Sequence, residues 1–108
     1  MNIIILEEAY NELLNAIDFY ENKTFGLGLR LKDEIDKYVK WITQNYDVPR
    51  LRKGLYRRVN LRIFPYYIAY IIRDNSIWIL AIAHCHRRPE YWIQRKKNLI
   101  EKGTLHFT

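Results

Sequence analysis

The chain has 108 residues, of which 49% are hydrophobic and 15% aromatic, and its formal net charge is +6. This length leaves room for one hydrophobic core, and the apolar content excludes an intrinsically disordered chain. The single cysteine, Cys85, excludes an internal disulfide. The sequence contains no run of about 18 apolar residues, the length needed to span a membrane. We therefore expect one domain, residues 1–108, in the cytoplasm.

The N-terminal half predicts a strand followed by two helices. Residues 2–6 form a short β-branched run, which is typical of a strand. Apolar residues then recur at helical spacing in two stretches, which predicts helices over about 7–22 and 27–44. Thr24, in the short turn between them, is a candidate cap for the second helix. Because the connection is so short, the two helices should form an antiparallel hairpin.

The C-terminal half predicts a three-stranded meander after a loop. Alternating or continuous apolar runs indicate strands over about 56–63, 66–73 and 76–84. Asp74 and Asn75 tolerate positive φ and suit a two-residue hairpin turn, which would place Tyr70 opposite Ile79 and Tyr67 opposite Ile82. The remaining segment, 88–108, should begin with a short helical turn. The fold class is therefore α+β, with the helical hairpin packed on an antiparallel sheet.

Two features of this sheet suggest a partner. The helices can cover only one face, so the second face needs the C-terminal segment, a twin subunit or a foreign peptide as cover. In addition, residues 50–97 carry 12 basic and 2 acidic side chains, whereas residues 1–49 carry 5 basic and 9 acidic ones. This basic half should attract nucleic acid or an acidic protein.

The densest group of reactive side chains follows the last strand, from His84 to Trp92. The spacing of His84, Cys85 and His86 is unsuited to zinc, and we expect neither a metal nor a cofactor. Metal-independent RNA cleavage is conceivable, with His84, His86 or Tyr91 moving protons and the arginines at 87 and 88 stabilising the phosphorane. The alternative is structural: the histidine packs at the strand end, the arginines bind an acidic partner, and Tyr91 and Trp92 close the core.

A second group interleaves arginines with aromatic residues along the strands: Arg57, Arg58, Arg62, Tyr66 and Tyr67. Such a combination grips single-stranded nucleic acid through phosphate contacts and base stacking. It equally makes a hot spot for protein binding.

Taken in order, these motifs resemble the RelE/ParE superfamily, the toxins of bacterial type II toxin–antitoxin pairs. The resemblance spans residues 9–95 and rests on residues 12–20, Gly26-Leu27-Gly28, Arg58, the strand 64–70, Ala83-His84 and residues 87–92. It implies a growth-inhibiting, plasmid-stabilisation-type toxin that an acidic, partly disordered antitoxin neutralises. The toxin would form a homodimer, or a heterotetramer with the antitoxin. The antitoxin would wrap the sheet with an extended or helical segment at Tyr67, Ile71, Arg73, Trp78 and Leu80.

Within this superfamily, RelE-like members cut mRNA in the ribosome and ParE-like members inhibit DNA gyrase. Arg87 and Tyr91 stand where RelE-like catalytic residues would fall, with His84 or His86 to assist, but Tyr66-Tyr67 replaces a strand arginine. The Phe-Pro-Tyr strand and the Arg-Pro-Glu-Tyr-Trp ending favour the ParE-like branch. The contacts to its target would then come from Arg57, Arg58, Arg62, Tyr67, Arg88 and Trp92. A non-catalytic nucleic-acid or peptide-binding module of the same fold is the third alternative.

Overall fold

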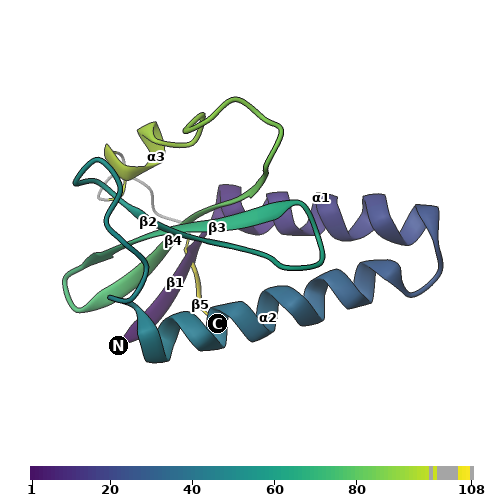
Figure 1. Cartoon of the computed structure of the whole chain (residues 1–108), viewed down its shortest axis with the longest axis horizontal. Helices are drawn as coiled ribbons and strands as arrows, with labels where there is room; N and C mark the ends of the chain where they lie inside the picture. Colours follow the sequence, from purple (N-terminus) through teal and green to yellow (C-terminus); the bar gives the residue numbers. More distant parts are fainter. Residues whose placement is uncertain (98, 100–104, 108) are drawn as a thin grey trace.

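The computed structural model describes residues 1–97, 99 and 105–107, the last three through their backbone. Figure 1 shows α3 on the opposite side of the sheet from α2. The elements, in chain order, are β1 (Asn2–Leu6), α1 (Glu7–Lys23), α2 (Leu27–Asn45), β2 (Arg57–Asn60), β3 (Tyr66–Arg73), β4 (Ser76–His84), α3 (Gln94–Lys97) and β5 (Leu105–Phe107). This confirms the α+β fold with its N-terminal strand, helical hairpin and meander.

The strands form one sheet in the order β2-β3-β4-β1-β5 within the described part of the chain. The predicted antiparallel pairing holds for β2, β3 and β4, but β1 lies parallel to β4, with Ile5 opposite Ile79. The backbone of β5 pairs antiparallel with the outer edge of β1. Within the described residues, no helix is long and apolar enough to cross a lipid bilayer.

The helices pack closely because of one glycine. A Cβ on Gly28 would lie 2.5 Å from the carbonyl oxygen of Ile17, so only glycine lets α2 approach α1 this closely. The helix start is capped differently from our expectation, in which Thr24 was the candidate. Gly26, at φ 84°, is the first flanking residue, and the carboxylate of Glu21 accepts hydrogen bonds from the N–H groups of Gly26 and Gly28.

The second strand is shorter than predicted, since β2 ends at Asn60 rather than near residue 63. The chain turns out of the ladder before Pro65, which has no N–H to donate. The carboxylate of Glu34, 8% exposed on α2, accepts hydrogen bonds from the N–H groups of Ile63 and Phe64. A buried acid thus compensates for the hydrogen bonds that the strand no longer makes.

The hairpin between β3 and β4 has the predicted turn, with φ of 54° at Asp74 and 58° at Asn75. Tyr70 lies opposite Ile79 as predicted, but Tyr67 lies opposite Ala83 rather than Ile82. A register irregularity between Ala69 and Tyr70 leaves an extra residue in β4, which is a β-bulge. Because side chains alternate along a strand, each residue of β4 beyond the bulge points to the face opposite to the one it would have in a regular ladder.

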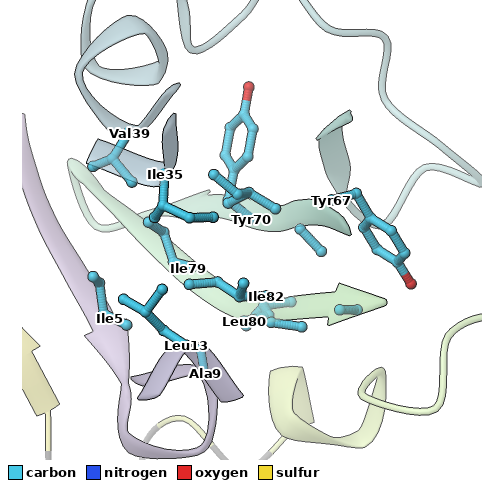
Figure 2. Packing of buried hydrophobic residues seen from close by; sticks show 14 of the residues in the cluster. Ile5, Ala9, Leu13, Ile35, Val39, Tyr67, Tyr70, Ile79, Leu80 and Ile82 are labelled. Carbon is cyan, nitrogen blue, oxygen red and sulfur yellow. The ribbon is translucent and has the colours of Figure 1, made fainter. Parts of the chain in front are cut away.

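The first face of the sheet carries the main core. Figure 2 shows Ala9 and Leu13 of α1 and Ile35 and Val39 of α2 gathered around Ile79 of β4. All five side chains are at most 8% exposed. Their burial fixes the helical hairpin against the sheet, which is the main apolar contribution to stability.

Of the three covers considered for the second face, the C-terminal segment is the one that the structure shows. Trp92 is 1% exposed, Leu99 3% and Tyr67 4%. The indole Nε1 of Trp92 donates to the hydroxyl of Tyr67 at 2.8 Å, and its ring meets Tyr56 edge-on at 4.7 Å between centroids. This face is therefore closed around Trp92 by the chain itself.

Candidate functional site

A hollow of about 240 Å³ opens between α1 and the ends of β3 and β4. The helix contributes an acid, an amide and an aromatic ring, and the strands and the following loop contribute aromatic and basic groups. Its lining comprises Glu12, Asn15, Ala16, Phe19, Tyr66, Ile82, His84, Arg87 and Tyr91. Three of the four predicted catalytic residues thus border one hollow, and His86 lies outside its lining.

The floor of this hollow is a hydrogen-bond network centred on Glu12. Its carboxylate accepts from the N–H of Ile82 at 3.1 Å, from both terminal nitrogens of Arg95 at 3.0 and 3.1 Å, and from the hydroxyl of Tyr91. Arg95 also donates to the carbonyl oxygen of Leu80 at 2.9 Å. The side chains of Glu12 and Arg95 are only 15% and 17% exposed, so this is a largely buried, two-pronged ion pair.

The position of the network follows from where β1 ends. The pairing of β1 with β4 stops at Ile79, so none of the described strands pairs with the next part of β4 on that side. Glu12 and Arg95 take over there, because they bind the N–H of Ile82 and the carbonyl of Leu80. The network therefore completes the sheet edge and attaches the C-terminal segment to α1.

Tyr91 is poorly placed to act as a base. Burial, and secondly the hydrogen bond to Glu12, raise the pKa of Tyr91 well above its ordinary value of 10.0. Its hydroxyl is therefore a committed donor at neutral pH. The guanidinium of Arg87 stacks on the Tyr91 ring at 3.9 Å, and Arg87 remains exposed to solvent.

The histidines form a small aromatic group at the end of β4. The His84 ring meets Tyr66 and His86 edge-on, each at 5.0 Å between centroids. Nδ1 of His84 accepts the backbone N–H of His86 at 3.0 Å, so a neutral His84 carries its proton on Nε2. No three potential metal ligands cluster anywhere in the described part of the chain.

The residues proposed for target binding divide into two groups. Arg58, Arg62 and Arg88 lie at or near the surface, where the Arg58 guanidinium stacks 4.0 Å above the Tyr67 ring. Arg57 instead holds the preceding loop, donating to the carbonyl oxygen of Pro49 at 2.6 Å. Tyr67 and Trp92 lie in the interior, so in this conformation neither presents its ring at the surface, and their contact with a target stays a prediction. They bury each other because the C-terminal segment folds back on the sheet.

The predicted antitoxin contacts divide in a similar way. Leu80, like Tyr67, is buried beneath the chain itself, and neither is free to contact a partner in this conformation. Trp78 is half-buried, and its Nε1 donates to the carbonyl oxygen of Arg73 at 3.1 Å. Ile71 is also buried, at 5% exposed, but it borders a second hollow of about 320 Å³ beside the loop 51–56, together with the half-buried Arg73.

The residues that sequence reasoning missed are the acids. The sequence singles out neither Glu12 nor Glu34 as a site residue, yet both bind strand or loop backbone. Arg95 is not singled out either. The sequence offers one weak signal, an acid one position before buried Leu13, and nothing links it to an arginine 83 residues away.

One family model matches residues 3–89, and it describes the ParE toxin of the type II toxin–antitoxin system parDE. The chain belongs to the ParE toxin family. Among solved structures, the chromosomal ParDE toxin–antitoxin system from P. aeruginosa contains a chain with a similar fold. The TM-score is 0.68 and the identity 22%, over 78% of this chain and 95% of that one. No curated protein sequence matches the chain closely enough to count as a relative.

The ParE family match ends at residue 89, before the C-terminal segment described above. Tyr91, Trp92, Arg95 and Leu99 therefore lie beyond the matched residues. Trp92, which covers the second face, and the two side-chain partners of Glu12 come from this part of the chain, whereas the N–H of Ile82 lies within the match. The matched region by itself would leave the carboxylate of Glu12 without its cationic partner.

Proposed function

We propose that this ParE-family chain is the toxin of a type II toxin–antitoxin pair, that it inhibits DNA gyrase, and that a cognate antitoxin neutralises it in the cytoplasm. The observation that carries the proposal is the family match over residues 3–89. Gyrase follows from the ParE-like branch, whose members were noted above to act on that enzyme. Maintenance of a plasmid is the corresponding biological role.

The contacts in the first hollow favour gyrase over mRNA as the target. A nuclease needs a group that accepts a proton and cations aimed at the scissile phosphate. The hydroxyl of Tyr91 is held by Glu12, and no basic side chain occupies the strand position of Tyr66 and Tyr67. His84 and Arg87 remain beside the hollow, so the ribonuclease alternative still calls for a direct test.

The charge distribution supports both proposed partners. The basic residues between 50 and 97 outnumber the acidic ones by 12 to 2, and Arg58, Arg62 and Arg88 are at or near the surface. A gyrase–DNA complex presents phosphate groups to such a surface. An acidic antitoxin segment would compete for the same charges, which gives a simple physical basis for neutralisation.

The proposal is tested by inducing the chain in bacteria and following plasmid topology and mRNA integrity together. We expect growth arrest with relaxed plasmids and intact mRNA. We also expect rescue by the cognate antitoxin, a small acidic protein that the reading frame adjoining this gene should encode. An Arg87→Ala variant serves as the control for nuclease activity. Ribosome-dependent mRNA cleavage that this variant abolishes would overturn the gyrase proposal, and the absence of any growth effect would favour the binding-module alternative.

A further inference from the structure

The second hollow lies where β3 extends beyond its neighbour β2. Pairing between these strands starts at Arg57, which faces Tyr70, whereas β3 continues to Arg73. Beyond that point the loop 51–56 approaches but forms no ladder, apart from the isolated bridge between Arg52 and Tyr56. Among the described strands, none covers the outer edge of β3 over residues 71–73.

The geometry of the hairpin shows which backbone groups face this gap. In a two-residue hairpin the residues flanking the turn, Arg73 and Ser76, form a hydrogen-bonded pair, and such pairs alternate along the ladder. The N–H and C=O of Ile72 must then point away from β4 and toward the hollow. Within the described chain the loop does not satisfy them, since the N–H groups of Leu55 and Tyr56 bond to the carbonyl of Arg52.

The side chains around this edge are apolar and cationic. Leu51 and Leu55 are 49% and 41% exposed, which is high for leucines bordering a hollow. Arg73 and Lys96 line the same hollow, and neither has a carboxylate within ion-pair distance among the described residues. Unpaired strand edges with such neighbours are sites where an extended segment adds as a further strand.

We propose that an extended, acidic segment of the antitoxin docks in this hollow, with its backbone paired to Ile72. Its apolar side chains would cover Leu51 and Leu55, and its carboxylates would pair with Arg73 and Lys96. This inference rests on the proposed function, because it takes the antitoxin as the partner. It places that contact at the uncovered edge of β3, away from the face that Trp92 already closes.

Hydrogen exchange at single amides tests the backbone pairing directly. The probe is the product of the adjoining reading frame, mixed with the full chain. The Ile72 amide should exchange rapidly in the free toxin and slow by at least about tenfold in the complex, because it gains a hydrogen-bond acceptor. The amide of Tyr70 is the internal control, since it already faces β2 and should be protected in both states.

Charge reversal tests the side-chain contacts. An Arg73→Glu/Lys96→Glu variant should raise the Kd for the antitoxin by tenfold or more, on the order expected for lost charge complementarity. The matched control is Lys37→Glu/Lys40→Glu on the exposed face of α2, which changes the net charge equally. Its Kd should change by less than about threefold. Circular dichroism of both variants verifies that they fold.

The outcomes separate this inference from the proposed function. If the wild-type chain binds no product of the adjoining frame, both are rejected. If a complex forms but the Ile72 amide keeps its free exchange rate, the docking proposal is rejected while the toxin–antitoxin pair stands. The docking proposal is also rejected if the two charge-reversal variants weaken antitoxin binding equally. It is likewise rejected if a second copy of the chain protects the Ile72 amide in the absence of antitoxin.

Discussion

Replacing Glu12 by alanine should destabilise the fold far more than the loss of an ordinary ion pair. The carboxylate receives hydrogen bonds from Arg95, Tyr91 and the N–H of Ile82, and its ion pair with Arg95 is over four-fifths buried. The substitution removes the acceptor of the Tyr91 hydroxyl and of the Ile82 N–H, and it leaves the buried guanidinium of Arg95 with the carbonyl of Leu80 but no carboxylate. Each such group loses its hydrogen bond without regaining full contact with water.

Breaking a buried pair by removing one partner costs about 3–5 kcal/mol. Because Glu12 and Arg95 are slightly exposed, we take the lower end and expect the free energy of unfolding to fall by about 3 kcal/mol. For a domain of this size the melting temperature should then fall by roughly 12–24 °C. Urea denaturation followed by far-ultraviolet circular dichroism measures the free energy, and calorimetry measures the melting temperature.

The matched control is Asp36→Ala. It breaks the Lys32–Asp36 pair, whose side chains are 49% and 59% exposed, and it should cost less than about 1 kcal/mol. A Glu12→Ala variant as stable as this control would refute the view that the network holds the C-terminal segment on the sheet. Combining Glu12→Ala with Arg95→Met should restore part of the loss, since the uncompensated charge is then gone.

Three further predictions follow from individual contacts. Gly28→Ala should lower the free energy of unfolding by about 1–3 kcal/mol in urea denaturation, because the new Cβ meets the carbonyl of Ile17 at 2.5 Å. Trp92→Ala should lower it by about 3–5 kcal/mol and increase the binding of a hydrophobic dye, since the second face loses its central cover. Burial raises the pKa of Tyr56 and of Tyr70 from 10.0 to about 12, so absorbance at 295 nm should show these two tyrosines, together with Tyr91, ionising late. A raised pKa means that the folded state favours the neutral tyrosine. The contribution of this preference to the free energy of unfolding is complete below pH 10 and is lost between pH 10 and about 12.

The controls for these predictions are close in sequence or in chemistry. Leu29→Ala, next to Gly28 but 61% exposed, should change the free energy of unfolding by less than about 0.5 kcal/mol. Trp41→Ala removes a partly exposed indole from α2 and should have a much smaller effect than Trp92→Ala. Tyrosines that all ionise together near pH 10 would contradict the burial argument, as would equal effects of the two tryptophan or the two helix substitutions.

The arrangement of elements was predictable because its signals are local. Helical spacing of apolar residues, the alternation of the strands and the turn residues Asp74 and Asn75 each act within a few positions. Tyr70 opposite Ile79 followed directly from that turn. The one-residue error at Tyr67 arose beyond a bulge in β4, and a bulge depends on how the strand packs against its neighbours rather than on its own residues.

The candidate site was only partly predictable. Sequence reasoning brought His84, Arg87 and Tyr91 together because they follow one strand, and the structure places them around one hollow. It did not find Glu12, which reaches this place only because β1 ends early and α1 then runs past β4. Contacts between residues 83 positions apart depend on the tertiary fold, and no local pattern encodes them.

The sequence predicted a second apolar face, but it did not predict which segment covers that face. The surplus apolar face was correctly inferred, but three covers were equally consistent with the sequence. Around Trp92 the cover is the C-terminal segment, because the indole donates to the hydroxyl of Tyr67 on the sheet. This segment lies beyond the residues that the family model matches. Among the described residues, the surface left for a partner therefore shifts toward Arg73 and the exposed leucines 51 and 55, at the end of β3.

The measurement closest to the central claim is DNA supercoiling by purified gyrase in the presence of the purified chain. We predict that micromolar toxin inhibits supercoiling, and that prior incubation with the acidic product of the adjoining reading frame restores it. Full supercoiling at micromolar concentrations of a correctly folded chain would contradict the account.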